Sequence, residues 1–218
     1  MPRAIVFFDV DGTLVPGTSS SQYLASFMGH ADALATAEQA YGHGTLSNQE
    51  VSVLDAAGWN GYTATQVAEW LADLPLVDGI LDVVRWLTER DVAPVLTTLA
   101  WEPVGTFLCD RFGFVDACGP RVGSIDGRFN GKVAQHCDEY DKRDFALRFA
   151  AAHQISATQC AAVGDSRSDE PLFDAVGFAV AFNASSPSLL NRADSSVVGD
   201  DLRQILPVIE NWLSSDDA

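Results

Sequence analysis

The sequence predicts an α/β protein with a Rossmann-like parallel sheet, helices on both faces of the sheet, and a helical segment inserted after the first strand. Three observations predict this fold class. Short apolar runs recur along the chain, as expected of strands that are buried on both faces. Helical patterns separate these runs, and that alternation is typical of parallel sheets. Between about residues 19 and 73 the apolar runs give way to helical spacing alone.

The expected elements follow from local patterns in chain order. Residues 4–9 form an apolar run that ends at Asp9, and the next few residues have the composition of a turn. Pro103 suits the first turn of a helix, Gly127 suits the turn of a hairpin between Val122 and Val133, and Asp141 is the expected cap of the helix that follows it. Beyond the insertion, the expected helices are 80–90, 141–153, 169–175 and 201–213, and the expected strands are 92–97, 160–163 and 178–182.

The inserted segment is expected to be helical throughout. Apolar residues recur there at helical spacing, first at Tyr23, Leu24, Phe27 and Met28 and again at Val67, Trp70, Leu71 and Leu74. Glycine-containing stretches at 42–44 and 58–61 separate the helices. We therefore expect a core domain made of residues 1–15 and 76–218, and a helical cap made of residues 16–75.

The composition is strongly acidic, with 13 Lys and Arg against 30 Asp and Glu and a formal net charge of −17. Such a field repels nucleic-acid backbones and anionic membranes, so neither is an expected partner. The first residues lack a signal-peptide pattern and no later segment is an expected membrane span, which predicts a cytoplasmic protein. The four Cys are scattered, and neither they nor the four His have the spacing of zinc ligands, so we expect reduced thiols and no zinc site.

Polar residues stand at the ends of three expected strands: Asp9 with Asp11, Thr97 with Thr98, and Asp165. Because ligands bind beyond the carboxyl ends of the strands in such sheets, we expect these residues to converge at one edge. The carboxylates of Asp9 and Asp11 repel each other unless a cation lies between them. A set of oxygen ligands favours Mg²⁺ over zinc. Such an acidic pair is also common in surface turns, so it is weak support when taken alone.

Four motifs in order make the pattern specific. They are DVDGTLV at 9–15, VLTT at 95–98, Lys142 at the start of a helix, and GDSRSD at 164–169. With these motifs the chain resembles the haloacid dehalogenase superfamily, and closely its phosphoserine-phosphatase-like branch, over nearly its whole length. The resemblance implies a Rossmann-like core with a helical cap inserted between the first and second motifs, where it would close over the site and exclude water.

The resemblance also implies a role for each motif residue. Asp9 is the expected nucleophile that forms an aspartyl-phosphate, and Asp11 is the expected general acid and base. Mg²⁺ is expected on Asp9, on Asp11 through its main-chain carbonyl, and on Asp165. Thr97 and Lys142 are expected to bind and stabilise the transferring phosphoryl group. Further phosphate-binding positions are Gly12, Thr98 and Ser168, and Asp169 is expected to orient Lys142 or a metal-bound water.

The chain is therefore expected to be a Mg²⁺-dependent phosphatase of a small phosphomonoester, acting as a monomer or a homodimer. Three alternatives stay open: phosphoserine phosphatase proper, a phosphomutase that uses the same two aspartates, and a catalytically idle binding protein with this fold. A dehalogenase is disfavoured because that chemistry does not need Asp11. The idle protein is disfavoured because every chemical position is filled.

The inserted segment departs from phosphoserine phosphatases, which carry a Glu after the first motif and an Arg in the cap. Thr18 occupies the position of that Glu by motif register, and no Lys or Arg occurs between Ile5 and Val84. We therefore expect L-phosphoserine to be a poor substrate, since its carboxylate would lack a charged partner.

A neutral, polar or cationic leaving group is expected instead, and three aromatic residues of the insertion are the candidates to contact it: Tyr23, Trp59 and Tyr62. Whether Arg143 or Arg167 of the core contacts the substrate is a question that the sequence leaves open.

Overall fold

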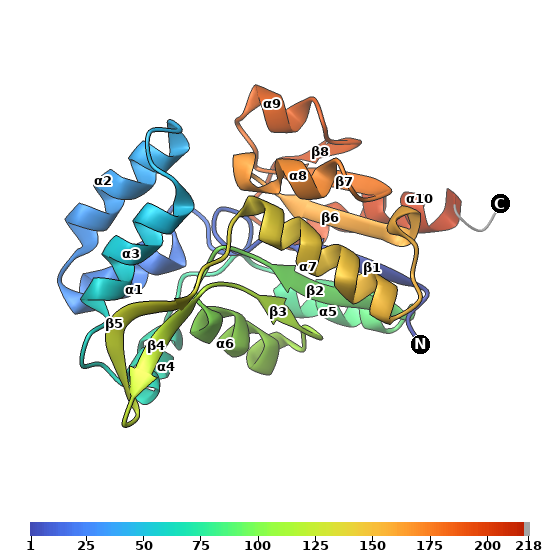
Figure 1. The fold of residues 1–218 in the computed structure, drawn as a ribbon. Helices are drawn as coiled ribbons and strands as arrows, with labels where there is room; N and C mark the ends of the chain where they lie inside the picture. Colours follow the sequence, from blue (N-terminus) through green and yellow to red (C-terminus); the bar gives the residue numbers. More distant parts are fainter. Residues whose placement is uncertain (216–218) are drawn as a thin grey trace.

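A computed structural model describes residues 1–215 and confirms the expected α/β architecture (Figure 1). The main sheet consists of β1 (Ala4–Phe8), β2 (Val92–Thr97), β3 (Ala117–Cys118), β6 (Cys160–Gly164), β7 (Phe178–Phe182) and β8 (Ser195–Val197). These strands are parallel and lie in the order β3-β2-β1-β6-β7-β8, so β1 is central between β2 and β6. A separate antiparallel hairpin consists of β4 (Arg121–Ile125) and β5 (Arg128–Gln135).

Helices follow most of the strands. They are α1 (Ser20–Met28), α2 (Ala31–Gly42), α3 (Asn48–Gly58), α4 (Ala64–Leu71), α5 (Ile80–Thr88), α6 (Glu102–Phe112), α7 (Glu139–Ala152), α8 (Glu170–Phe173), α9 (Pro187–Leu190) and α10 (Leu206–Ser215). Three short 3₁₀ segments, η1 (Ala157–Gln159), η2 (Arg167–Asp169) and η3 (Leu202–Ile205), lie between them. Within residues 1–215, no helix is long and apolar enough to cross a membrane.

The side chains of β1 alternate between two apolar layers, and all of them are buried. Ile5 and Phe7 belong to the layer beneath α7 and α8, where the ring of Phe7 meets that of Phe149 edge-on at 6.4 Å. Val6 and Phe8 belong to the opposite layer, beneath α5, α6 and α10. A strand buried on both faces needs an apolar residue at every position, which explains the unbroken apolar run at the start of the sequence.

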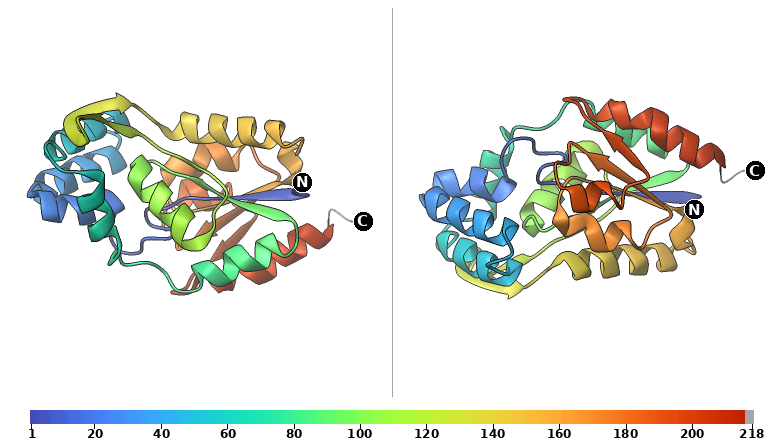
Figure 2. Two further views of the ribbon diagram at one scale, coloured as in Figure 1. Left: turned by 90° about the horizontal axis from the view of Figure 1, so that it is seen from below. Right: turned by 90° about the horizontal axis from the view of Figure 1, so that it is seen from above.

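Helices α1 to α4 lie together at one end of the molecule, beyond the carboxyl ends of the central strands, and the N-terminus lies toward the opposite end (Figure 2). These helices have a small apolar cluster of their own, formed by Ala25, Leu34, Ala37 and Val51. Other apolar side chains of the same helices, such as Leu24 and Leu71, join the larger core cluster of the sheet. The inserted helices therefore pack firmly on the rest of the chain.

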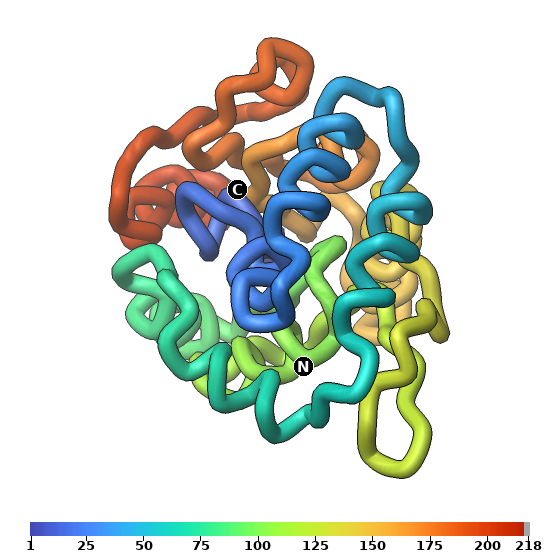
Figure 3. The backbone as a smooth tube through the Cα atoms, turned by 90° about the vertical axis from the view of Figure 1, so that its left-hand side faces the viewer, coloured from blue at the N-terminus to red at the C-terminus, as the bar shows by residue number. Residues whose placement is uncertain are grey.

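The β4–β5 hairpin lies beside the inserted helices and outside the main sheet (Figure 3). The main-chain N–H of Gly61 donates to the carbonyl of Phe129 (2.9 Å), and the N–H of Phe129 donates to the carbonyl of Tyr62 (2.8 Å). The guanidinium of Arg128 also donates to the Gly61 carbonyl (2.7 Å). A segment that is distant in sequence thus extends the wall formed by the inserted helices.

The helix that carries Lys142 begins earlier than the sequence predicted. Asp138 is its N-cap: its Oδ1 accepts hydrogen bonds from the main-chain N–H groups of Tyr140 (2.9 Å) and Asp141 (3.0 Å). The prediction of Asp141 as the cap was therefore wrong. Two acidic residues lie three positions apart here, and Asp141 takes the second place of a capping box by bonding back to the N–H of Asp138 (3.0 Å).

The other predicted elements are confirmed, with shifts of a few residues at some ends and with the last helix preceded by η3. Strands β3 and β8 and helix α9 were not predicted. They have two, three and four residues respectively, which is too short for a periodic pattern to be recognised.

Candidate active site

The parallel register of three neighbouring strands brings Asp9, Thr97 and Asp165 to one edge of the sheet. The last residue of β1 is level with the next-to-last residues of β2 and β6. Asp9 therefore lies level with Thr97 and with Gly164, one residue before Asp165. The N–H of Asp9 donates to the carbonyl of Val163 (2.9 Å), which fixes the beginning of the loop that follows β1.

The loop after β1 passes very close to Asp165. Gly12 has φ +89°, and a Cβ at this position would lie 2.2 Å from Oδ2 of Asp165, so only glycine fits. The hydroxyl of Thr13 donates to Oδ1 of Asp165 (3.1 Å). Oδ1 of Asp11 accepts from the N–H of Ser20 at the start of α1 (2.7 Å). Both carboxylates are thus held in defined orientations.

Lys142 is fully buried, and its ammonium group contacts three side chains. Nζ lies 3.1 Å from Oδ1 of Asp9 and 2.5 Å from Oδ1 of Asp169, and it donates to the hydroxyl of Ser168 (3.3 Å). Burial alone would lower the pKa of Lys142, but the carboxylates of Asp169 and Asp9 raise it above its usual value. The lysine therefore stays charged and fixes the orientation of Asp9.

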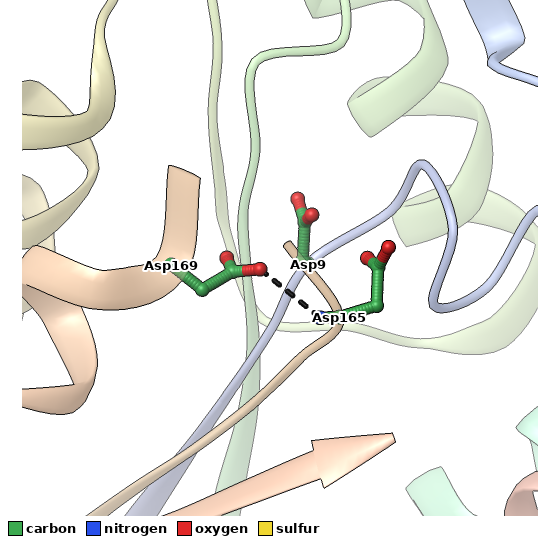
Figure 4. Close-up of side chains that lie close together, drawn as sticks. All are labelled: Asp9, Asp165 and Asp169. Carbon is green, nitrogen blue, oxygen red and sulfur yellow. Dashed lines mark hydrogen bonds between the residues drawn. The ribbon is translucent and has the colours of Figure 1, made fainter. Parts of the chain in front are cut away.

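The carboxylates of Asp9, Asp165 and Asp169 each bring one oxygen within 4.8 Å of the others (Figure 4). The side chain of Asp169 is held by the loop that follows β6, because its Oδ2 accepts hydrogen bonds from the N–H groups of Asp165 (3.1 Å) and Ser166 (3.2 Å). Asp169 is thus bonded to both Lys142 and the fourth-motif loop. The side chain of Asp11 is not a member of this group of three.

These carboxylates fit a hard divalent cation. Burial, followed by the charge of Asp169, raises the pKa of Asp9 well above its usual value, although Lys142 acts in the opposite direction. Burial and Asp169 likewise raise the pKa of Asp165 to about 7. A cation next to these oxygens would offset both effects, and ligands that are all oxygen are those preferred by Mg²⁺.

The two threonines at the end of β2 differ in what their hydroxyl groups do. Thr98 accepts a hydrogen bond from the N–H of Ala100 (3.0 Å), so its side chain supports the turn. The hydroxyl of Thr97 is completely buried and has no hydrogen-bond partner in the described part of the chain. Because buried polar groups are rarely left unpaired, this hydroxyl is available for a ligand at the site.

A cavity of about 260 Å³ lies between the inserted helices and the strand ends, and Asp9 and Asp11 both line it. Its core wall also includes Thr98, Trp101, Ser166, Arg167 and Ser168. Its other wall comes from the inserted segment and includes Ser19, Glu38, Tyr41, Asn48 and Asp55. A larger cavity of about 530 Å³ lies between α6 and α7, and none of the predicted site residues lines it.

Asp55 is a residue that the sequence did not single out, yet it is completely buried in the cavity wall. Its Oδ1 accepts from Nε1 of Trp59 (3.3 Å) and lies 2.7 Å from Nε2 of His30. Its Oδ2 accepts from Nε1 of Trp101 (2.7 Å), which belongs to the core. A signal was present, because Asp55 lies midway between Val51 and Trp59 at helical spacing, on the buried side of α3.

The three aromatic residues expected to contact the leaving group do not line the cavity. Trp59 is buried behind Asp55 and stacks edge-on with Trp101 (5.8 Å). Tyr23 donates its hydroxyl to the carbonyl of Trp70 (2.9 Å), and the ring of Tyr62 packs on the same tryptophan (5.3 Å). That expectation was wrong, and the aromatic residues that do line the cavity are Tyr41 and Trp101.

The two arginines that the sequence left open lie in different places. Arg143 bonds to Asp144 (2.7 Å) and does not line the cavity. Arg167 does line it, with its guanidinium over the ring of Tyr41 (4.5 Å) and 3.5 Å from Oε1 of Glu139. Arg167 is therefore the arginine within reach of a ligand in the cavity.

The chain matches the family model described as haloacid dehalogenase-like hydrolase over residues 6–174. It is 28% identical over 199 residues to a protein of Streptomyces coelicolor named phosphoserine phosphatase, covering 89% of this chain but 47% of that protein. It therefore spans about half the length of that relative. It is also 31% identical over 201 residues to the inhibition of morphological differentiation protein of Streptomyces azureus, covering 81% and 70% of the two chains.

The fold has a close counterpart among solved structures. A structure described as a phospho-aspartyl intermediate analogue of phosphoserine phosphatase superposes with a TM-score of 0.84, covering 95% of this chain and 99% of that one. The sequences are 21% identical, so this likeness concerns the fold. The two chains thus share the overall fold.

Proposed function

The chain belongs to the haloacid dehalogenase-like hydrolases, and we propose that it is a Mg²⁺-dependent phosphatase that acts on a small phosphomonoester through an aspartyl-phosphate on Asp9. The observation that carries the proposal is the setting of Asp9. Its carboxylate is buried at the floor of the cavity, is held by Lys142 and lies beside Asp165. The names of the relatives, several of them phosphoserine phosphatases, support phosphate-ester hydrolysis.

In the first half of the proposed reaction, Asp9 attacks phosphorus. Its Oδ1 is engaged by Lys142, which leaves Oδ2 as the attacking atom. The bond from Oδ2 to phosphorus forms while the bond from phosphorus to the alcohol oxygen breaks. The Lys142 ammonium and the unpaired hydroxyl of Thr97 stabilise charge on the phosphoryl oxygens, and the main-chain groups at Gly12 and Thr98 complete their binding.

Asp11 is proposed to move the protons. Burial raises its pKa, and the hydrogen bond from Ser20 acts in the opposite direction. The protonated carboxyl gives its proton to the departing alkoxide. In the second half, the carboxylate takes a proton from a water molecule whose oxygen attacks phosphorus. The bond from phosphorus to Asp9 then breaks, and inorganic phosphate leaves.

Mg²⁺ is proposed to be held by Asp9, Asp165 and the main-chain carbonyl of Asp11. When bound, the ion offsets the negative charge that the nucleophile shares with the phosphate. Asp169 is proposed as a positioning residue, because its carboxylate bonds to Lys142 and to the N–H of Asp165. Ser168 lines the cavity and contacts Lys142 (3.3 Å), and it is proposed to bind the phosphate.

The division into a core of residues 1–15 and 76–218 and a cap of residues 16–75 is also part of the proposal. Residues of the inserted helices, among them Glu38, Tyr41 and Asp55, line the cavity together with Asp9, which is where a cap would exclude water. We further propose that the protein acts in the cytoplasm as a monomer or a homodimer. The thiols of Cys109, Cys118, Cys137 and Cys160 are free, as suits a reducing compartment.

The test is hydrolysis of p-nitrophenyl phosphate with Mg²⁺ and with EDTA, together with binding of beryllium fluoride, which mimics phosphate on an aspartate. We expect Mg²⁺-dependent release of inorganic phosphate and beryllium fluoride binding that is lost in the Asp9→Asn variant. Release of phosphate from a single ester separates a phosphatase from a phosphomutase, which returns the phosphoryl group to a substrate. If the wild type shows no turnover and does not bind beryllium fluoride, the result favours the catalytically idle protein.

A further inference from the structure

The cavity above Asp9 has an uneven distribution of charge. Its cap wall carries two carboxylates, those of Glu38 and Asp55, and the inserted segment contributes no Lys or Arg. Arg167 is the only Lys or Arg among the described residues that line the cavity. Its guanidinium lies over the ring of Tyr41 and near Glu139, so its charge is already partly offset. The part of a ligand farthest from Asp9 would therefore meet an acidic wall.

Asp55 is held in place by neutral or weakly basic donors. Three N–H or ring nitrogen groups surround its carboxylate, those of His30 (2.7 Å), Trp59 (3.3 Å) and Trp101 (2.7 Å). An ionised carboxylate has about four acceptor sites, so this one keeps a site for a further donor. The two indoles fix its position from the cap and from the core at once.

Glu38 has no cationic partner in the described chain. Its Oε1 accepts from the hydroxyl of Ser19 (2.7 Å), and its Oε2 accepts from the amide of Gln22. Glu38 therefore adds to the cap wall a second carboxylate that no Lys or Arg of the described chain contacts. Burial raises the pKa of Glu38, hydrogen bonds from Ser19 and Gln22 act in the opposite direction, and the charges of Asp11 and Asp55 raise it further. The carboxylates of Asp11, Glu38 and Asp55 all line the same cavity.

We propose that this acidic wall selects phosphate esters whose alcohol carries an ammonium group, held by Glu38 and Asp55 while Asp9 meets the phosphorus. This inference rests on the proposed phosphatase function and specifies its substrate class as aminoalkyl phosphates. Tyr41 lies in the cap wall beside these carboxylates, and Trp101 lines the cavity from the core wall. The buried hydroxyl of Tyr41 also lacks a hydrogen-bond partner in residues 1–215, so it can accept from an ammonium.

The same wall disfavours an alcohol that carries a carboxylate. Such a group would be placed in the low-dielectric cavity near Glu38 and Asp55 without a cap cation to pair with it. Phosphoserine carries both an ammonium and a carboxylate, and therefore gains one contact and meets one repulsion. The structure thus favours 2-aminoethyl phosphate, which is phosphoserine without its carboxylate.

The experiment compares kcat/KM for three esters: 2-aminoethyl phosphate, propyl phosphate and phosphoserine. The alkyl group of propyl phosphate is similar in size to the aminoethyl group but carries no charge. We expect 2-aminoethyl phosphate to exceed each of the others by at least about tenfold, the effect of one charged hydrogen bond. Glu38→Gln should lower kcat/KM for 2-aminoethyl phosphate by roughly 10- to 100-fold and change that for propyl phosphate by less than about threefold. The matched control is Glu69→Gln, which removes the same charge from an exposed position on α4.

A second measurement does not depend on turnover. Titration calorimetry on the Asp9→Asn protein compares the affinities for 2-aminoethyl phosphate and propyl phosphate, and the Glu38→Gln substitution should remove the difference between them. Equal affinities, or an equal loss of kcat/KM for both esters in Glu38→Gln, would overturn the charge selectivity. If the wild type hydrolyses no ester, including p-nitrophenyl phosphate, the proposed function fails, and the calorimetry alone decides the selectivity.

Discussion

The close approach of Gly12 to Asp165 leads to a specific prediction for the Gly12→Ala variant. The new Cβ would lie 2.2 Å from Oδ2 of Asp165, whereas ordinary contacts of this kind begin at 3.4 Å. The carboxylate must therefore move by about 1 Å, and a displacement of that size in a catalytic group can cost on the order of 100-fold in rate. We expect kcat/KM to fall by roughly this factor and the Mg²⁺ concentration needed for half-maximal activity to rise at least about tenfold.

Gly61→Ala is the matched control for this experiment. Gly61 has the same φ of +89° as Gly12, but no atom lies within 4 Å of the position that its Cβ would take. Both variants therefore carry the same strain of a left-handed backbone, about 1–2 kcal/mol, and only Gly12→Ala displaces a carboxylate. Thermal unfolding should show similar losses of stability in the two proteins.

The assay is steady-state hydrolysis of p-nitrophenyl phosphate over a range of Mg²⁺ concentrations, with calorimetric titration of Mg²⁺ as a readout independent of activity. We expect Gly12→Ala to have a lower Mg²⁺ affinity and a lower kcat/KM than Gly61→Ala. If Gly12→Ala and Gly61→Ala show the same Mg²⁺ affinity and the same kcat/KM, the reasoning from the Asp165 contact is refuted.

Three further predictions concern the charged groups of the site. Asp9→Asn should lower kcat by several orders of magnitude, as expected when a covalent nucleophile is replaced by an isosteric amide, and wild-type turnover would end the proposed mechanism. Asp165→Ala should weaken Mg²⁺ binding in calorimetry, and EDTA should abolish turnover of the wild type; full activity in EDTA would contradict the proposed metal site. Lys142→Met should reduce the free energy of unfolding by about 3–5 kcal/mol, because Asp9 and Asp169 lose a buried partner. Adding Asp169→Asn should recover part of that loss in urea unfolding, and no recovery would argue against charge repulsion as the cause.

The fold and the core half of the site could be predicted because strand register determines both. A strand buried on both faces is an unbroken apolar run, so β1, β2, β6 and β7 were recognisable in the sequence. A polar residue that ends or directly follows such a strand lies at the carboxyl edge of the sheet, regardless of the conformation of the loops. Asp9, Thr97 and Asp165 were placed by this rule, and the structure brings them together.

The hairpin shows a limit of the same reasoning. Its turn at Gly127 was predicted from local sequence, but its position beside the inserted helices was not. That position depends on main-chain hydrogen bonds of Phe129 with Gly61 and Tyr62, which lie far from it in the chain. Local patterns predict that an element forms, but they do not predict which other element it packs against.

The cap side of the site could not be predicted, because no register rule places residues of packed helices. The helical spacing of Val51, Asp55 and Trp59 indicated that Asp55 shares a buried helix face, but it could not show which groups surround its carboxylate. The partners of Asp55 are cap residues of three helices, α2, α3 and α6, and the bond from Trp101 depends on how α3 docks on the core. On the proposed function, the inserted helices would determine which alcohol is accepted, whereas the residues at the strand ends would carry out the chemistry. A change in helix docking could alter selectivity and leave Asp9, Lys142 and Asp165 in place.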